Sequence, residues 1–203
     1  MNNFNDLRAF IIGNKEYISR TESMVKLIDL VEKRFNGKPI NIVETGTMRG
    51  HLGGLWSGGD GCSSLVFARL AKIVNGHFWT VDLSQQNINQ CKIFTRDYEK
   101  YITYAAQDSI AFLRDFSHKI DVLYLDSYDT GYEEEMRAAC RHQLEECRAV
   151  LDKLNEDSII LSDDAPTLDC GKVVYSVPFL RENGFKILWN SVELGQVALS
   201  KIE

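Results

Sequence analysis

Acidic side chains end several of the predicted strands, and their positions could support binding or catalysis. Each follows a short apolar run rich in β-branched residues, which is typical of a buried strand. The carboxylates at these ends are Glu44, Asp82, Asp108, Asp126, Asp163 and Asp164. Functional residues of an open α/β sheet gather at the carboxyl ends of its strands, so we expect these side chains to share one edge. For each of them, simple capping of the following helix is the alternative.

A glycine-rich segment, 46–61, follows the first of these strands and precedes a helical pattern. Glycine permits positive φ angles and close approach of a ligand to the backbone, so the segment predicts a nucleotide-like ligand, with a surface loop as the alternative. Asp82 could accept hydrogen bonds from ribose hydroxyls. Residues 44–50 read Glu-Thr-Gly-Thr-Met-Arg-Gly, not the Gly-x-Gly-x-x-Gly that seats a pyrophosphate. Because an acidic edge would also repel a pyrophosphate, the balance favours S-adenosylmethionine over a nicotinamide dinucleotide.

A second group comprises Asp126, Asp163 and Asp164, which neighbouring strands would bring together. Clustered carboxylates resist ionising together unless a cation offsets them. Oxygen ligands without His or Cys favour Mg²⁺ or Ca²⁺, and such an ion could lower the pKa of a bound hydroxyl. The alternative is a turn at residues 163–166, in which the Asp side chains cap backbone amides and Pro166 fixes the bend.

Three candidates could take part in proton transfer: Asp126, His142 within a helical pattern, and Lys172 after the Asp pair. For His142 and Lys172, an ordinary surface or packing role is the alternative. Trp56 and Asp60 lie in the glycine-rich segment and could belong to a lid over a cofactor.

The elements that must position these residues alternate between strand and helix. Strands are predicted over 40–43, 77–82, 101–106, 120–126, 158–164, 185–189 and 196–200, and helices over 20–35, 63–74, 85–100, 109–116, 132–154 and 173–183. Such alternation predicts an α/β fold with right-handed crossovers and a mostly parallel, Rossmann-like doubly wound sheet. The mixed residues 1–18 are expected to be peripheral, and residues 1–36 to form an N-terminal helical extension of a single domain, 1–203.

The composition of the chain argues against several classes of function. The chain has 203 residues and a net charge of −6 without a basic stripe, which argues against nucleic acid as a partner. No apolar run is long enough to span a bilayer and no signal peptide is visible, so we expect a cytoplasmic protein without a membrane partner. The five cysteines are widely spaced and are expected to be reduced and mostly buried.

Together, these residues resemble the class I S-adenosylmethionine-dependent methyltransferases from about Ile40 to the end of the chain. Residues 44–50 are similar to the family's first motif, Asp82 to its ribose-binding acid and residues 106–109 to its adenine-side segment. The resemblance implies a seven-stranded sheet with an antiparallel last strand. It implies cofactor contacts from Glu44, Gly46, Thr47, Gly50, Asp60, Asp82, Leu83, Gln107, Asp108 and Ser109.

Within that family, the chain most resembles metal-dependent enzymes like catechol O-methyltransferase, where an Asp ends the fourth strand and an acidic pair ends the fifth. This implies metal ligands at Asp126, Asp163 and Asp164. Two departures are Asp129, where the catechol enzymes carry a basic Lys, and the insertion 51–61. A catechol is therefore not the expected acceptor.

The sequence thus predicts methyl transfer from S-adenosylmethionine to an oxygen of a small molecule, assisted by Mg²⁺ or another divalent cation. The alternatives are an NAD(P)-dependent oxidoreductase and a non-catalytic S-adenosylmethionine-binding protein. A homodimer is left open, as are the acceptor and the general base.

Overall fold

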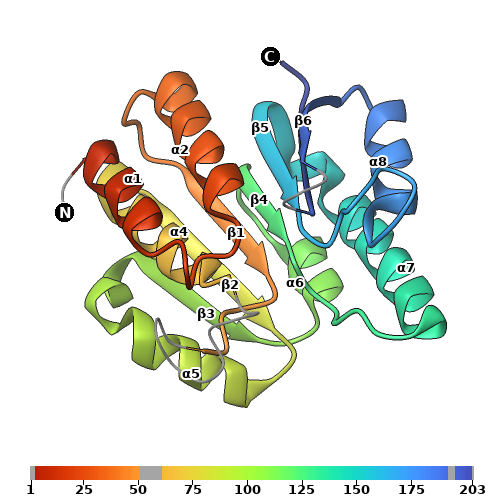
Figure 1. Ribbon diagram of the computed structural model, residues 1–203, viewed down its shortest axis with the longest axis horizontal. Coiled ribbons are helices and arrows are strands. Elements are labelled where there is room, and N and C mark those ends of the chain that lie inside the picture. Colours follow the sequence, from red (N-terminus) through yellow and green to blue (C-terminus); the bar gives the residue numbers. More distant parts are fainter. Residues whose placement is uncertain (1–2, 51–60, 192–194, 203) are drawn as a thin grey trace.

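The computed structural model describes residues 3–50, 61–191 and 195–202 of the chain, and one mixed sheet organises them (Figure 1). Its seven strands run in the order β3-β2-β1-β4-β5-β7-β6. They are β1 (Asn41–Thr45), β2 (His77–Asp82), β3 (Ile102–Ala106), β4 (Ile120–Leu125), β5 (Leu154–Ser162), β6 (Lys186–Ser191) and β7 (Gln196–Ser200). The first five strands are parallel, whereas β7 is antiparallel to both of its neighbours. The predicted α/β class and antiparallel last strand are confirmed.

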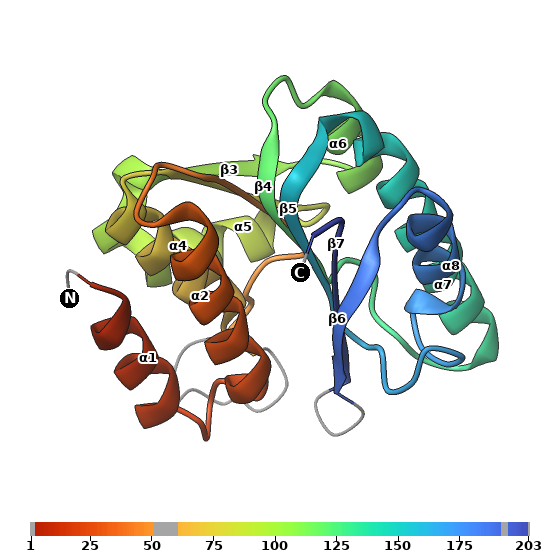
Figure 2. The ribbon, with the colours of Figure 1, turned by 90° about the horizontal axis from the view of Figure 1, so that it is seen from above.

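Helices cover both faces of this sheet (Figure 2). On one face lie α1 (Phe4–Gly13), α2 (Thr21–Phe35), α4 (Ser63–Val74) and α5 (Gln85–Thr95). On the other lie α6 (Ser109–Asp115), α7 (Glu133–Val150) and α8 (Val173–Glu182). Short 3₁₀ helices, η1 (Arg96–Tyr101) and η2 (Leu151–Lys153), follow α5 and α7.

The alternation of side chains along each strand divides the apolar interior into two cores. Ile42 and Val122 pack with α1, α2 and α4, whereas Val43 and Leu123 pack with α6, α7 and α8. Because consecutive strand residues point to opposite faces, a strand buried on both faces must be apolar throughout. Accordingly, β4 is apolar from Val122 to Leu125 and Asp126 is the first polar residue after it. In β1 only Ile42 and Val43 are apolar, and the buried Glu44 and Thr45 that end the strand are polar.

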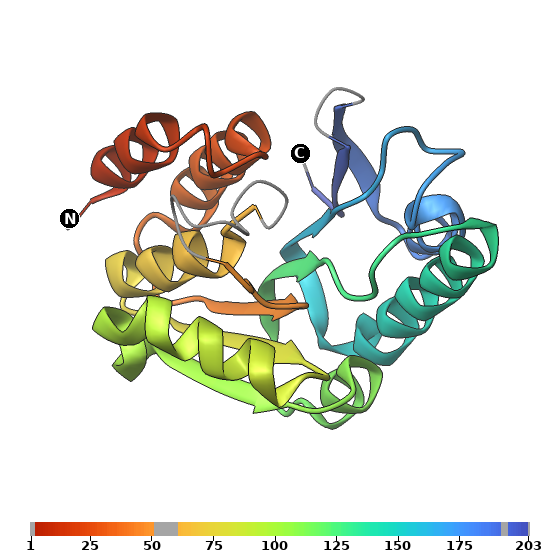
Figure 3. The ribbon, with the colours of Figure 1, turned by 60° about the horizontal axis from the view of Figure 1, so that its bottom comes forward.

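The carboxyl ends of the parallel strands lie at one edge, where Figure 3 shows the arrowheads of β1, β2 and β3 pointing the same way. The amide of Asp126 donates to the carbonyl of Thr45 at 2.9 Å, and the amide of Asp163 donates to the carbonyl of Leu125 at 3.0 Å. The ladder therefore continues just past β4 and β5 and fixes the acidic residues that follow these two strands.

Several predicted elements differ from the structure in burial or in bounds. Residues 1–18 are not peripheral, because α1 buries Leu7 and Ile11 completely against the core. The fifth strand begins at Leu154 rather than at residue 158, with a register irregularity beside β4. The predicted helix 85–100 is α5 followed by η1. The insertion, with Trp56 and Asp60, lies outside the described residues except for Gly61.

No helix in the described part of the chain is both long and apolar enough to cross a membrane. The five cysteines are free thiols, and only Cys170 is exposed, as expected.

Candidate active site

A cavity of about 690 Å³ opens at the carboxyl edge of the sheet. Residues from five strand ends line it, together with the segment before α2 and the start of α8. Ligand sites commonly have volumes of about 300–1,000 Å³. Five of the six predicted carboxylates line it, at the ends of four strands: Asp82, Asp108, Asp126, Asp163 and Asp164. The strand-end acids therefore converge on one space.

The loop after β1 forms one wall of the cavity. Gly46 has a φ of 81°, and a Cβ there would lie 2.4 Å from the carbonyl oxygen of Asp126, so only glycine fits. Its neighbour Thr47 also lines the cavity and contacts Thr80 Oγ1 at 2.9 Å. Of the glycines in the predicted segment 46–61, Gly46 and Gly61 line the cavity, whereas residues 51–60 lie outside the described part of the chain.

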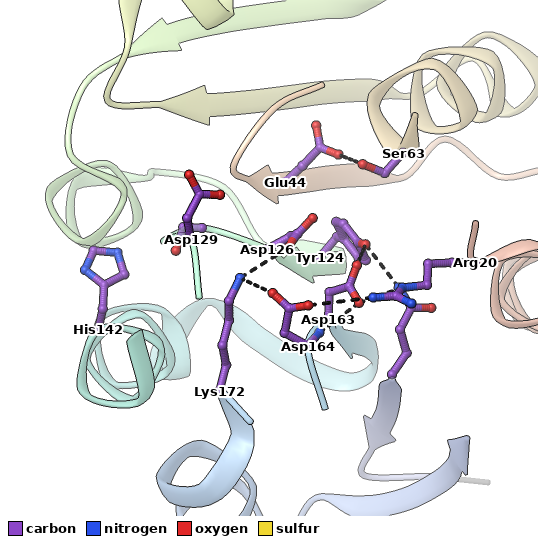
Figure 4. Close-up of polar contacts among 12 residues, drawn as sticks. Arg20, Glu44, Ser63, Tyr124, Asp126, Asp129, His142, Asp163, Asp164 and Lys172 are labelled. Carbon is purple, nitrogen blue, oxygen red and sulfur yellow. Dashed lines mark hydrogen bonds and ion pairs between the residues drawn. The ribbon is translucent and has the colours of Figure 1, made fainter. Parts of the chain in front are cut away.

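Glu44 is turned away from this cavity (Figure 4). Its carboxylate is buried and accepts hydrogen bonds from Ser63 Oγ at 2.6 Å, Ser64 Oγ at 2.5 Å and Thr80 Oγ1 at 2.8 Å. These contacts tie β1 to the start of α4 and to β2. In this structure, Glu44 braces the loop and does not itself line the space predicted for a cofactor.

The acids after β2 and β3 occupy the same wall. Asp82 Oδ1 accepts from the Ser84 amide at 2.7 Å and from Asn87 Nδ2 at 3.1 Å, which fixes its carboxylate at the cavity. Asp108 caps α6 through the Ala111 amide at 2.8 Å. Asp108 therefore both caps α6 and lines the cavity.

Of the other residues predicted to contact the cofactor, some line the cavity and others do not. Leu83 and Ser109 line the cavity, whereas Gln107 and Gly50 are not part of its lining. The backbone of Gln107 donates to the carbonyl of Asp82 at 3.0 Å, which joins the loops after β2 and β3. Asp60 lies outside the described residues.

Asp163 is the most deeply held acid of the second group. It is 6% exposed, and Oδ1 accepts from Arg20 Nε at 2.9 Å while Oδ2 accepts from Tyr124 Oη at 2.7 Å. The pKa of Tyr124 is raised well above its usual range by burial and by the charge of Asp163. Burial alone would lower the pKa of Arg20, but Asp163, Tyr124 and Asp164 together outweigh this effect and raise it. The guanidinium therefore stays charged beside this carboxylate.

Lys172 lies between the two remaining acids. Its side chain is 2% exposed, and Nζ is 2.9 Å from Asp164 Oδ2 and 3.3 Å from Asp126 Oδ1. Burial lowers the pKa of Lys172, but Asp126 and Asp164 more than compensate, so the net shift is upward. The pKa of Asp126 is raised well above the usual aspartate value by burial and by the charge of Asp163, despite the opposing effect of Lys172. The ammonium group of Lys172 is thus held between two carboxylates, and the carboxylate of Asp126 binds a proton more readily than an ordinary aspartate does.

The residues predicted as metal ligands do not fit a divalent ion in this arrangement. Arg20 and Lys172 reach the three carboxylates from opposite sides (Figure 4). Among residues 3–50, 61–191 and 195–202, no group of three His, Cys, Asp or Glu side chains could hold a metal. The three carboxylates instead pair with protein cations, Asp163 with Arg20 and Asp126 and Asp164 with Lys172.

His142 lies on α7 at a different part of the cavity wall. Its Nε2 is 2.9 Å from Ser109 Oγ and 3.4 Å from Glu146 Oε1, and its ring is 5.4 Å from that of Tyr128. Burial lowers the pKa of His142, but the hydrogen bond and charge of Glu146 outweigh it and raise the pKa. Its contacts therefore connect it to the start of α6 and not to Lys172.

Several residues at the cavity were not predicted as site residues. Arg20 is 143 positions away from Asp163 in the sequence, and no motif marks it. Asn87 is the third residue of α5, and its position five residues after Asp82 could have suggested that it binds the carboxylate of Asp82. Asp129, at the position of the catechol enzymes' Lys, pairs with Arg49 Nη1 at 3.0 Å, and both residues line the cavity.

Fold and site together define a class of protein. A seven-stranded sheet with an antiparallel β7, a glycine-bearing loop after β1 and an acid after β2 are the features of class I S-adenosylmethionine-dependent methyltransferases. The chain belongs to a methyltransferase domain family, whose model matches residues 57–165. The predicted class is confirmed.

Solved structures of low sequence identity share this fold. SAH-bound PaMTH1, a methyltransferase of Podospora anserina, has a TM-score of 0.61 and 13% identity over 97% of this chain and 86% of that one. A putative rRNA-methylase of Clostridium thermocellum has a TM-score of 0.58 and 15% identity over 86% and 94%. SMU.1697c, a putative methyltransferase of Streptococcus mutans in complex with SAH, has 0.56 and 10% over 84% and 92%. A search of curated proteins found no match.

Proposed function

We propose that this protein transfers the methyl group of S-adenosylmethionine to a hydroxyl oxygen of a small molecule. The observation that carries the proposal is the convergence of Asp82, Asp108 and Asp126 on one cavity. A rim of carboxylates attracts a ligand that bears a sulfonium and an ammonium, whereas it repels a pyrophosphate. This favours S-adenosylmethionine over a nicotinamide dinucleotide.

The cavity walls suggest how the cofactor would lie. Asp82 would accept hydrogen bonds from the ribose hydroxyls, because its carboxylate is already oriented by Ser84 and Asn87. The loop at Gly46 and Thr47 would contact the methionine portion. Asp108 and Ser109 would border the adenine, with His142 holding Ser109 in place. In this arrangement, His142 is a positioning residue on the cofactor side.

The acceptor would lie against Asp126 and Lys172. Its O–H bond breaks and the proton passes to the Asp126 carboxylate, while an oxygen lone pair forms the new bond to the methyl carbon. The C–S bond breaks, and its electron pair stays on sulfur as S-adenosylhomocysteine leaves. A positioned carboxylate of raised pKa is a suitable base, and alignment of the reacting atoms contributes much of the rate.

A small acceptor suits the described surface better than a nucleic acid. The net charge of −6 gives no attraction for a phosphate backbone. The acceptor end of the cavity also has no excess of positive charge, because its two cations, Arg20 and Lys172, face the three carboxylates Asp126, Asp163 and Asp164. An uncharged or cationic hydroxyl compound is therefore the expected substrate class.

Calorimetry with S-adenosylhomocysteine tests the cofactor assignment. We expect Asp82→Asn to weaken binding about 10- to 100-fold, since charge-assisted hydrogen bonds to ribose contribute about 1.5–3 kcal/mol. Asp97→Asn is the matched control, because Asp97 is an exposed acid outside the cavity lining and should leave binding unchanged. Binding of NAD(H) without binding of S-adenosylhomocysteine would instead support the oxidoreductase alternative.

The non-catalytic alternative is separated from the enzyme by Asp126→Asn. We expect this variant to retain S-adenosylhomocysteine binding and to lose methyl transfer to any hydroxyl acceptor that the wild type methylates. The rate of methyl transfer should fall about 10²- to 10⁴-fold below that of the wild type, which is the usual contribution of a general base. Retained methyl transfer at the wild-type rate would remove Asp126 from the mechanism.

A further inference from the structure

The acidic residues at the acceptor end of the cavity lie beside positively charged side chains of the same chain. Three carboxylates, Asp126, Asp163 and Asp164, meet two protein cations, Lys172 and Arg20. Each carboxylate has a cation within 3.3 Å. Repulsion among the acids is thus offset by the chain itself, without an added ion.

The position of the ammonium decides whether an ion could join it. Lys172 Nζ lies between Asp126 and Asp164, at 3.3 Å from Oδ1 of the first and 2.9 Å from Oδ2 of the second. A Mg²⁺ or Ca²⁺ bound by both carboxylates would lie about 2.0–2.6 Å from each oxygen, which is the same space. An ammonium and a divalent cation cannot share it.

The surroundings hold Lys172 in this place. Its backbone amide donates to the carbonyl of Asp164 at 3.0 Å, and Gly171 before it has a φ of 82°. A Cβ at Gly171 would lie 2.0 Å from that same carbonyl oxygen, so the turn closes tightly onto the acidic pair. The side chain cannot leave without exposing two carboxylates to each other.

We propose that the ammonium group of Lys172 stands in for a divalent cation, so that methyl transfer by this protein needs no metal. This inference rests on the proposed function and specifies its electrostatics. Lys172 would donate a hydrogen bond to the acceptor oxygen as negative charge develops on it, while Asp126 takes the proton. Arg20 would neutralise Asp163, which leaves Lys172 free to serve the other two acids and the acceptor.

The test compares Mn²⁺ binding by the full chain of the wild type and of Asp126→Asn, using electron paramagnetic resonance after treatment with EDTA. We expect equal, non-saturating signals from both proteins, because neither would have a metal site. Stoichiometric Mn²⁺ binding by the wild type that Asp126→Asn abolishes would overturn the proposal.

A second pair of variants tests the ammonium directly. Lys172→Met removes the charge and keeps the chain length, so the opened carboxylates should gain Mn²⁺ affinity by about tenfold or more, the effect of relieving about 1.4 kcal/mol of repulsion. Lys26→Met is the matched control, because Lys26 pairs with Glu22 on α2 and should change nothing. Failure of a folded Lys172→Met protein to gain Mn²⁺ binding would also overturn the proposal.

Binding of S-adenosylhomocysteine in excess EDTA separates the two proposals. Metal-free wild type that binds it supports the cofactor assignment, and the Mn²⁺ measurements above then decide whether Lys172 replaces the cation. Wild type that binds no S-adenosylhomocysteine, with or without Mn²⁺, contradicts the proposed function. Wild type that binds it and also holds stoichiometric Mn²⁺ at Asp126 contradicts only the metal-free mechanism.

Discussion

Lys172 and Asp126 form the pair on which the proposed chemistry depends. The buried ammonium lowers the cost of a charged Asp126, yet burial and Asp163 still raise the pKa of this carboxylate. A carboxylate that binds a proton more readily than ordinary aspartate is a better base near neutral pH. The pair thus combines a proton acceptor with a fixed positive charge.

This pair predicts a definite pH dependence. The groups that face Asp126 are Lys172, Asp163 and Asp164, and their net effect with burial is an upward shift. We expect its carboxyl carbon, assigned by comparison with Asp126→Asn, to titrate in ¹³C NMR above the usual value of about 3.9. Below that pKa the base is protonated, so methyl transfer should fall as the pH decreases through it. Lys172→Met should raise the pKa further, because the ammonium favours the ionised form; a titration at or below the ordinary value would contradict this account.

At the scale of single residues, sequence reasoning picked out several residues that line the cavity. Asp82, Asp108, Asp126 and Lys172 could be located because each follows a recognisable strand or motif. Glu44 matched the same pattern, but its carboxylate faces Ser63 and not the cavity. Side-chain direction at a strand end depends on which partners the fold supplies, and hydroxyls on α4 and β2 supplied them here. The metal prediction lacked Arg20, a counter-charge from a distant segment.

At the scale of elements, the turn between β1 and α4 shows why glycine is required where the ligand would lie. Gly46 combines a positive φ with a close approach to the backbone at Asp126. The loops after β1 and β4 therefore touch through main-chain atoms. Any side chain at this position would separate them.

Gly46→Ala should accordingly lower the free energy of unfolding by more than the strain of a positive φ alone would. We expect a loss of about 2–4 kcal/mol in the free energy of unfolding, from backbone strain of about 1–3 kcal/mol together with the clash at the Asp126 carbonyl. Gly37→Ala is the matched control, because Gly37 has a φ of 73° but nothing within 4 Å of a Cβ. Its cost should be about 1 kcal/mol. Urea denaturation of both variants measures the difference, and equal losses would show that the close approach does not matter.

Element prediction succeeded where hydrophobic periodicity was clear. The helix Ser63–Val74 and the strands His77–Asp82 and Gln196–Ser200 have the predicted bounds. The fifth strand was less predictable, because its first half, Leu154 to Asp157, is polar after Leu154 and pairs with β4 through an irregular register. Tertiary pairing extends a strand there that local sequence does not favour.

At the scale of the whole molecule, the N-terminal helices complete one face of the sheet. Leu7 and Ile11 of α1 are fully buried in the same core as Ile42 and Phe78. The buried residues Phe4, Leu7 and Ile11 recur at i, i+3 and i+7, which is a helical spacing. The helix has only ten residues and also carries the apolar Phe10 and Ile12 outside this buried face, which weakens the periodic signal. Burial here comes from packing on α2 and α4.

Leu7→Ala should therefore destabilise the whole protein. We expect a loss of about 2–5 kcal/mol in the free energy of unfolding, the usual cost of a core leucine truncation. Ile12→Ala, on the exposed side of the same helix, should change it by about 0.5 kcal/mol or less. Thermal and urea unfolding check both, and a stable Leu7→Ala protein would mean that α1 folds apart from the core.

The position of Arg20 links this helical layer to the carboxyl edge of the sheet. The residue immediately precedes α2, while its guanidinium neutralises a buried acid after β5. A ligand or a neighbouring protein that loosened the first two helices would withdraw that guanidinium and leave Asp163 without its counter-charge. Catalytic rate could then respond to events on a surface that never touches the substrate.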